Sequence, residues 1–480
     1  MFLKFRLIQT TIVLIGPMVG SCFASPFIET DEMRLRHAID VLSSRGLINM
    51  PTNTYPLNWG EVKKQLDSIE LKEPAGVVRA AMHTLKSRFH YEQQHHFQKG
   101  FLLQSGDRGY HFQGFGPRKS VKQSLTAFTE YTWENFSGRL SVTWNNGDEL
   151  PNHKRTFDGS FLAMNSGNWI LSVDQMSRWW GPGNDSALLL SNNARPLPVV
   201  SITRRENLPF ESSFLRWVGS WRLTTFLGRA ENSGFVPNTL VWGMRFGFRP
   251  IPSLEIGLNR IAQWGGDDRS QNMSTFTKVL LGQDNDGGEQ PGNQLASMDV
   301  VFHGYPWFEI PISAYIELAG EDESGFAPSK KFFLYGLNYT PNWLNSSVTK
   351  FFIEASDTVA SQYDVAYEHH IFKSGYRRYG RALGSTYDSD SQSVVFGMNQ
   401  SLESDLTYWA KLRWIKLNQG SGDRDHHGIT KLPVDSKGIE LGLEYPVFNG
   451  LLHMNLSYQT EEINPIDSRF LYFLKYEYHF

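Results

Sequence analysis

Alternation of apolar and charged residues in the last segment of the chain constrains its fold more than any other feature. From Phe470 to Phe480 the even-numbered positions are all apolar or aromatic, whereas Lys475, Glu477 and His479 are odd-numbered. Side chains of a strand point alternately to its two faces, so one face of this segment is apolar to its last residue. In a soluble protein such a terminal strand would be an aggregation-prone edge unless it were buried in a sandwich. A closed barrel in a lipid bilayer removes the edge and places the aromatic rings at the membrane interface.

The same period of two recurs from about residue 97 to the C-terminus, as in the segments 240–248, 253–264, 332–339 and 438–445. Charged residues on the second face are compatible with a water-filled lumen and incompatible with a dry sandwich core. Roughly 384 residues follow position 96, which at about 20 residues per strand and connection predicts about 18 strands. The predicted fold class is therefore an all-β transmembrane antiparallel β-barrel of about 18 strands, with the polar face inside. Polar-face charges include Glu317, Lys411, Arg413, Glu440 and Glu444.

The connections between predicted strands differ in length and polarity. Tight turns are expected at 249–253 and 444–450, whereas 265–275, 281–294 and 418–431 are long and polar. Short turns on one side and long loops on the other are typical of outer-membrane barrels. We expect the long loops to face the cell exterior.

Residues 1–24 have the features of a secretory signal peptide. Lys4 and Arg6 precede an apolar stretch too short for a membrane-spanning helix, and small residues surround Ala24. Cleavage after Ala24 is expected; the alternative is a lipoprotein-type cleavage that leaves a lipidated Cys22. Because Cys22 is the single cysteine, a mature chain without disulfides is expected after the first cleavage, which fits an outer membrane.

Residues 25–96 are expected to form a separate three-helix unit before the barrel of 97–480. Leu35, Ile39 and Leu42 recur at helical spacing, with Thr30 or Asp31 as the expected cap and Gly46 at the end. A second helix is led by Asn58, and Pro74 stands in the first turn of a third. The unit has few apolar residues, so we expect it to dock on the barrel and plug it.

Three long segments resemble a known family. They are LRHAIDVLSSRGLINMPTNTYPLNWGEVKKQL, SRWWGPGNDSALLLSNNARPLPVVSITR and FLGRAENSGFVPNTLVWGMRFGFRPIPSLEIGLNRIAQWGG, which are similar to the Wzi family of capsule assembly proteins of enteric bacteria. The resemblance covers essentially the whole mature chain. It implies an eighteen-stranded outer-membrane barrel with a helical plug at the periplasmic end. It also implies a lectin-like role that attaches capsular or extracellular polysaccharide to the cell surface, without known catalysis.

The first candidate polysaccharide-binding group comprises Trp179, Trp180, Asn184 and Asp185. Aromatic faces stack on sugar rings, and the turn 181–183 (Gly-Pro-Gly) can present them beside the hydrogen-bonding Asn and Asp. The alternative is a structural pair of tryptophans. The following segment 191–196 is predicted to be a connection folding into the lumen, with Arg195 paired to an inward carboxylate.

The second candidate group comprises Arg204, Arg205, Trp264, Asp267 and Arg269. Arginines make bidentate contacts with the carboxylates of an acidic polysaccharide, and Trp264 could stack on a sugar. The alternatives are solvated loop charges or contacts with lipopolysaccharide phosphates.

Metal and cofactor sites are not expected. The segment 284–289 (Asp-Asn-Asp-Gly-Gly-Glu) offers oxygen ligands but falls short of a calcium loop, so a polar loop is the alternative. The histidine pairs 95–96, 369–370 and 426–427 have no cysteine or spaced carboxylate nearby. No hydrolase, zinc-protease or phosphate-loop motif occurs, although loosely spaced Ser, Asp and His at a barrel rim can be catalytic.

The leading interpretation is a non-enzymatic surface anchor for polysaccharide. Its expected partners are the polymer, outer-membrane lipid and lipopolysaccharide, and the barrel-insertion machinery, which would read the terminal Phe480. The first alternative is a sugar-specific porin, whose selectivity the inward Glu317, Lys411, Arg413, Glu440 and Glu444 would set. The second is a rim hydrolase. A net charge of −3 argues against a nucleic-acid partner.

Overall fold

The computed structural model describes residues 26–480, with gaps at 73, 108–111, 120–121, 147–154, 282–291, 325–326, 344–346, 361–364, 421–425, 462 and 464–468, and leaves the side chains of 322–329 undescribed. The expected signal peptide with Cys22 and the candidate calcium segment 284–289 lie outside the described residues.

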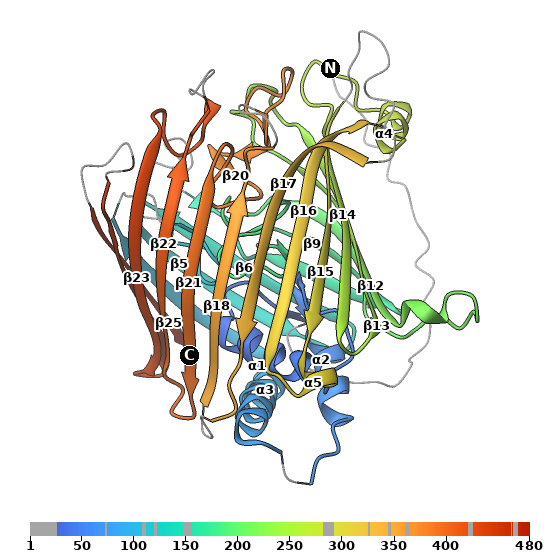
Figure 1. The fold of residues 1–480 in the computed structure, drawn as a ribbon, viewed down its shortest axis with the longest axis vertical. Coiled ribbons are helices and arrows are strands. Elements are labelled where there is room, and N and C mark those ends of the chain that lie inside the picture. Colours follow the sequence, from blue (N-terminus) through green and yellow to red (C-terminus); the bar gives the residue numbers. More distant parts are fainter. Residues whose placement is uncertain are drawn as a thin grey trace, which may run out of the picture.

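The described strands close into a single antiparallel barrel (Figure 1). Its members are β4 (Phe97–Gly106), β5 (Gln123–Thr132), β6 (Phe136–Asn145), β7 (Arg155–Thr156), β8 (Phe161–Ser166), β9 (Trp169–Asp174), β11 (Val199–Arg204), β12 (Ser220–Arg229), β13 (Leu240–Ile251), β14 (Leu254–Trp264), β15 (Gly292–His303), β16 (Ile312–Ser324), β17 (Ala327–Tyr339), β18 (Ser347–Asp357), β21 (Gln392–Leu402), β22 (Thr407–Leu417), β23 (Val434–Val447), β24 (Gly450–Gln459) and β25 (Phe470–His479). Because β7 and β8 both pair with β6, they share one position, and the described barrel has 18 strand positions, which confirms the predicted number. The last strand, β25, pairs with β4 and closes the ring, as the aromatic C-terminal pattern predicts.

The outer wall of the barrel is apolar. Alternate residues of the strands are exposed aliphatic side chains, and these include Leu103, Leu125, Leu140, Leu162, Leu258, Leu337, Leu412 and Leu441. Exposed aromatic residues lie near both ends of the strands, with Trp133, Trp307, Trp343 and Phe448 at one end and Trp144, Tyr335, Trp414 and Tyr472 at the other. An aliphatic band between two aromatic girdles is the surface that a membrane-spanning barrel requires.

Three helices pack together at one end of the barrel, which we call the helix end (Figure 1). They are α1 (Met33–Ser44), α2 (Trp59–Asp67) and α3 (Gly76–Gln94), and they confirm the three predicted helices. Asn58 caps α2 as predicted, because its Oδ1 accepts the N–H of Glu61 at 3.2 Å. The cap expected at Thr30 or Asp31 is wrong, since α1 begins at Met33 without a side-chain cap. None of the described helices is long and apolar enough to cross a membrane.

The two ends of the barrel carry connections of different kinds. The turn after β13 and the turn between β23 and β24 are tight and lie at the helix end, as predicted. The described parts of the next connections, 265–281, 418–420 and 426–433, lie at the opposite end, which we call the loop end and which also carries α4 (Met273–Leu280). One helix-end connection, 205–219, is longer than its neighbours; it contains the 3-10 turn η1 (Arg216–Val218) and projects sideways from the wall (Figure 1).

Segments of the chain itself fill the lumen. The connection between β9 and β11 folds inward, and its short strand β10 (Trp179–Trp180) pairs with β2 (Thr54–Tyr55) from the N-terminal region. The connection between β18 and β21 covers this segment from the loop end, because the hydroxyls of Tyr367 and Tyr376 donate to the carbonyls of Leu188 and Leu189. The polar face of the wall therefore meets protein rather than an open channel over these described segments.

Candidate functional site

Residues 178–197, which we call the lumen plug, contain the first predicted group. Every one of these residues is buried. The rings of Trp179 and Trp180 are fully covered: Trp179 packs edge-on against Phe115, and Trp180 packs against Phe226 of β12. In this structure neither indole face is open to a sugar.

Asp185 lies at the centre of the plug and is completely buried. One carboxylate oxygen, Oδ1, lies 2.7 Å from Lys411 Nζ and 2.7 Å from a guanidinium nitrogen of Arg413, both on β22. The other oxygen accepts the hydroxyl of Tyr387 and the Nε of Arg413. Burial by itself raises the pKa of Asp185, but Arg413 and then Lys411 lower that pKa well below its usual range. Asp185 is therefore a fixed anion that holds the plug to the wall.

Inward carboxylates of two other wall strands also bind the plug. Glu354 of β18 accepts the backbone N–H groups of Asn184, Asp185 and Ser186 at 2.6, 3.0 and 2.8 Å. Glu317 of β16 accepts the N–H of Leu188 at 3.2 Å. The side chain of Asn184 is held by Lys350, Tyr315 and Asn338. Three of the five charges that the porin alternative assigned to selectivity, Glu317, Lys411 and Arg413, thus hold the plug.

The remaining inward charges are also engaged. Glu440 pairs with Lys119 at 2.8 Å and with Arg413 at 2.7 Å, and Glu444 lies 3.6 Å from His453. Arg195 pairs with Asp158 at 2.7 Å, which agrees with the predicted pairing of Arg195 to a carboxylate. A buried ion pair with good geometry fixes a conformation, because removal of one partner leaves a charge without compensation.

The structure divides the second predicted group between the two ends of the barrel. Arg204 ends β11 at the helix end, where its guanidinium lies 3.5 Å from the ring centre of Trp221. Trp264 ends β14 at the loop end, where it is buried beneath Phe276 of α4. The period of two predicts the strands that carry Arg204 and Trp264. It does not show at which end of the barrel each of these strands ends.

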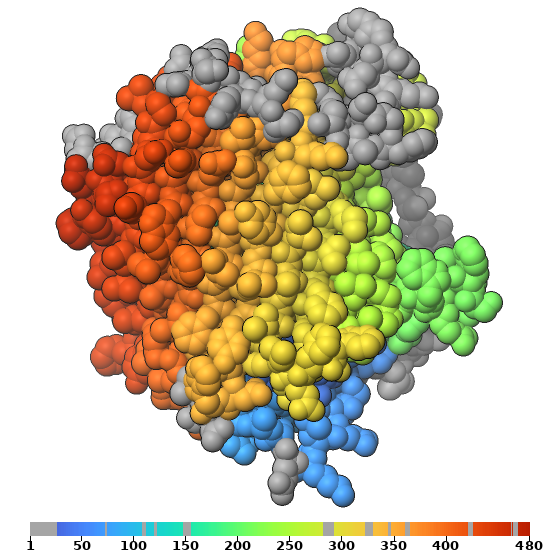
Figure 2. Space-filling model, in the orientation of Figure 1, coloured from blue at the N-terminus to red at the C-terminus, as the bar shows by residue number. Residues whose placement is uncertain are grey.

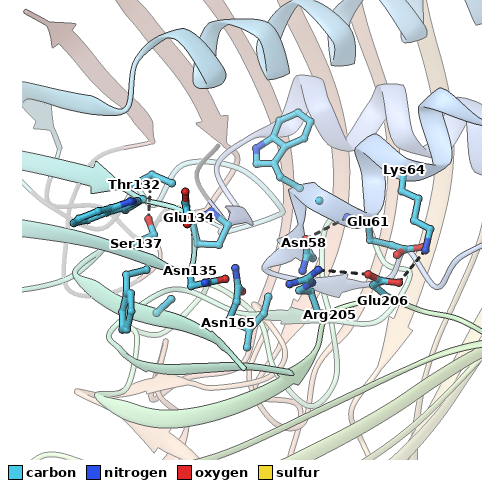
Figure 3. A pocket seen from close by; sticks show the side chains of 17 residues that line it. Asn58, Glu61, Lys64, Thr132, Glu134, Asn135, Ser137, Asn165, Arg205 and Glu206 are labelled. Atoms are coloured by element: carbon cyan, nitrogen blue, oxygen red, sulfur yellow. Dashed lines mark hydrogen bonds and ion pairs between the residues drawn. The ribbon is translucent and has the colours of Figure 1, made fainter. Parts of the chain in front are cut away.

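Arg205 lines a cavity of about 120 Å³ at the helix end (Figure 3). The cavity lies between α2, the β5–β6 turn and the β11 exit. Arg205 and Lys64 both contact Glu206, with Lys64 Nζ at 2.9 Å from Oε2. The side chains of Asn135 and Asn165 face the cavity beside these ion pairs (Figure 3). The volume suits a small polar molecule and is well below the roughly 300 Å³ of most ligand pockets.

Three connections meet at the loop end and form what we call the loop-end patch, comprising Phe235, Arg269, Phe372 and Lys373. The ring of Phe235 is 60% exposed, and Lys373 Nζ lies 5.0 Å from its centre. The Arg269 guanidinium lies 5.4 Å from the ring of Phe372. The backbone N–H of Phe235 donates to Ser374 Oγ at 2.7 Å, which joins the β12–β13 connection to the β18–β21 connection.

Of the predicted loop residues, Arg269 belongs to this patch and Asp267 lies two residues before it in the same connection. Asp267 is exposed and accepts a hydrogen bond from Asn238 Nδ2 at 2.9 Å. Phe235 and Lys373 were missed, because 30 or more residues separate each from the 265–275 loop and only the fold brings them together. An exposed aromatic residue in a polar, glycine-containing connection is the signal that could have identified Phe235.

A serine–histidine pair at the loop end bears on the rim-hydrolase alternative. Ser391 Oγ lies 3.2 Å from His427 Nε2. His427 Nδ1 accepts the N–H groups of Ile429 and Thr430, each at 3.2 Å, so the proton resides on Nε2. Burial lowers the pKa of His427. In this arrangement the imidazole donates to Ser391 and does not take its proton, unlike a catalytic base.

A closed barrel with an apolar outer wall, aromatic girdles and a lumen occupied by its own chain defines a membrane-spanning protein of the outer membrane rather than a soluble β protein. The model of the family described as capsule assembly protein Wzi matches residues 93–468. The chain belongs to this family, whose function is capsule assembly, and the resemblance drawn from the sequence is confirmed.

Two relatives extend the likeness over nearly the whole chain. A Klebsiella pneumoniae protein described only as an uncharacterized 55.8 kDa protein in the cps region is 30% identical over 478 residues, covering 97% of this chain and 92% of that one. The solved structure of Wzi from Escherichia coli is similar with a TM-score of 0.85 and 28% identity, covering 95% of this chain and 100% of that one. That protein is described as a carbohydrate-binding β-barrel involved in group 1 capsule assembly.

Proposed function

We propose that this protein is a non-catalytic anchor that binds capsular or extracellular polysaccharide at the loop end of the barrel and holds it at the cell surface. The loop end faces the exterior, and α1–α3 with the rest of residues 25–96 close the periplasmic end. Lipopolysaccharide and outer-membrane lipid surround the wall, and the insertion machinery recognises the aromatic C-terminal strand. The arrangement of long connections at one end and tight turns at the other supports this orientation.

The loop-end patch is the observation that carries the proposal. It combines an exposed aromatic ring with an arginine and a lysine from three different connections, which suits stacking on a sugar together with pairing to its carboxylate. The lumen plug supports the connections from below through Tyr367 and Tyr376. A long polymer offers the same unit many times, so weak binding by many barrels gives strong retention.

The test is binding of the producing strain's own polysaccharide to the detergent-solubilised protein, with an unrelated polysaccharide as control. The variant Phe235→Ala/Arg269→Gln/Lys373→Gln should lose at least about tenfold in affinity, from the loss of stacking and charge contacts. A matched helix-end variant, Phe214→Ala/Arg205→Gln/Lys64→Gln, should bind as the unaltered protein does. An equal loss of affinity in both variants, or a loss only in the helix-end variant, would overturn the proposed location of the polysaccharide site at the loop end.

Two further measurements on the same preparation separate the alternatives. Polymer length after prolonged incubation should stay constant, and shortening would favour the rim hydrolase. Single-channel recordings should show no steady conductance, because the plug is fixed by the buried ion pairs of Asp185 and by backbone hydrogen bonds to wall carboxylates. Steady conductance without polysaccharide binding would favour the porin.

A further inference from the structure

A hollow of about 690 Å³ lies on the outer wall near the loop end, across β18, β21, β22 and β23. This wall faces the viewer in Figure 2. The floor of the hollow contains Ala355. This small side chain lies between the larger outward residues Tyr335 and Val394, which are its cross-strand neighbours. Trp414 forms the next side of the hollow, directly opposite Val394.

The strand register divides this wall into rows. Phe396, Leu412 and Ile439 form one row, opposite one another on neighbouring strands, and all three are exposed and apolar. A second row lies four residues closer to the loop end on each of these strands. It consists of Gln392, Lys416 and Asp435, which are polar and exposed. The hollow lies between these rows, at the boundary between the hydrocarbon-facing band and the headgroup region of the membrane.

Two lysines beside the hollow have amino groups that form no hydrogen bond or ion pair with the described residues. Lys416 and Lys437 lie diagonally on adjacent strands, and both line the hollow. Three carboxylates also line the hollow: Asp357, which accepts from Gln392 at 2.8 Å, Asp435, which accepts from Gln419 at 3.2 Å, and Glu461. Exposed lysines next to an apolar surface keep their stems on that surface and extend their ammonium groups to its polar margin.

We propose that the hollow is a binding site for lipopolysaccharide, with acyl chains lying over Ala355 between Tyr335 and Trp414 and a lipid phosphate paired with Lys416 and Lys437. The site spans about four strands, or roughly 19 Å, which is wide enough for several acyl chains side by side. The carboxylate of Asp435 and the amide of Gln392 meet hydroxyl groups of the sugar part. The bound lipid would steady the loop-end margin of β21–β23 beside the polysaccharide-binding surface. This inference rests on the proposed orientation but not on polysaccharide binding itself.

The experiment titrates delipidated, detergent-solubilised protein with purified lipopolysaccharide and counts bound molecules by native mass spectrometry. Lys416→Gln/Lys437→Gln should weaken binding by about thirtyfold, since each lysine near a lipid phosphate contributes about a factor of five. Ala355→Phe fills the hollow without changing charge and should also abolish the tight site. The control Lys72→Gln/Lys86→Gln removes two exposed helix-end lysines and should bind as the unaltered protein does.

Three results would overturn the site. They are equal binding by all four proteins, equal binding of phosphatidylglycerol by the unaltered protein, and loss in the control. Unchanged heat-modifiability on gels verifies that each variant is folded. Polysaccharide binding is measured separately on the same samples, so a protein that binds lipopolysaccharide but no polymer would refute the anchor function and leave this site intact.

Discussion

The helix end and the loop end of the barrel are closed by different parts of the chain. At the helix end α1–α3 bury a continuous apolar cluster that includes Ile39, Leu42 and Leu85, and the cluster extends into the lumen as far as Trp179. At the loop end the closing contacts are mixed. Tyr367 and Tyr376 pack in an apolar cluster with Leu188 and Leu189 and donate their hydroxyls to plug carbonyls, and Arg377 pairs with Asp388. The helix end is thus closed by a three-helix core, whereas the loop end is closed by connections between strands that combine apolar packing with hydrogen bonds and ion pairs.

The lumen plug joins these two ends, and removal of its central ion pair should cause the largest loss of stability. Asp185→Ala leaves Lys411 and Arg413 buried without their anion, so we expect a loss of about 3–5 kcal/mol in the free energy of unfolding. Urea unfolding of the solubilised protein measures this loss. Asp268→Asn serves as control and should change stability little, because Asp268 is exposed and asparagine tolerates its φ of 61°. An equally small effect of Asp185→Ala would show that the plug is not needed to join the ends.

Acid should act on the same ion pair. Burial raises the pKa of Asp185 and that of Asp388, but Arg413 with Lys411 and Arg377 respectively lower both below the ordinary value of 3.8. A carboxylate with a depressed folded-state pKa stabilises the fold above its unfolded-state pKa, and this stabilisation is lost as pH falls below that value. Thermal unfolding should therefore shift to lower temperature below about pH 4. Asp185→Asn should flatten this dependence; an unchanged slope would contradict the assignment.

A pair of substitutions tests the difference between the ends directly. Ile39→Ala at the helix end opens a cavity in the apolar cluster, which should cost about 2–5 kcal/mol. Tyr376→Phe at the loop end leaves the carbonyl of Leu189 without its hydroxyl partner, which should cost only about 1 kcal/mol. The same urea titration compares them. A larger effect for Tyr376→Phe would contradict this expected difference between the two ends.

Salt should reveal a difference between the two ends in polysaccharide affinity rather than in stability. If Arg269 and Lys373 pair with an acidic polymer, affinity should fall roughly tenfold between about 0.05 and 0.5 M NaCl, because salt screens exposed charges. Arg269→Gln/Lys373→Gln should bind more weakly at low salt and show little further dependence. Surface plasmon resonance with immobilised polymer provides the measurement. Salt-independent binding by the unaltered protein would indicate recognition of neutral sugars.

The smallest effect is expected at the helix-end cavity. Lys64 and Glu206 are 49% and 33% exposed, and their ion pair spans 2.9 Å. Exposed pairs contribute about 0–1 kcal/mol, so Lys64→Ala should leave both stability and polysaccharide affinity nearly unchanged. Denaturation and binding curves measured side by side test this. A marked loss of polymer binding would place part of the recognition at the helix end.

Much of the fold was predictable because it follows from local periodicity. The alternation in 240–248 or 438–445 fixes which side chains face the lumen, and the helical spacing of Leu35, Ile39 and Leu42 predicts α1. The candidate site was less predictable. Trp179 and Trp180 stand beside a glycine-rich turn in the sequence, which is equally consistent with an exposed platform and a buried plug.

By itself, the sequence determined the membrane-facing barrel, the strand number, the three helices and the family, because each depends on the order of residues along the chain. Tertiary structure alone decided that Asp185 lies between Lys411 and Arg413, that Arg204 and Trp264 lie at opposite ends, and that Phe235 meets Lys373. These outcomes depend on where connections travel in three dimensions. A connection carries no periodicity, and its path is set by partners far away in sequence, so only the folded barrel specifies which charges and rings meet.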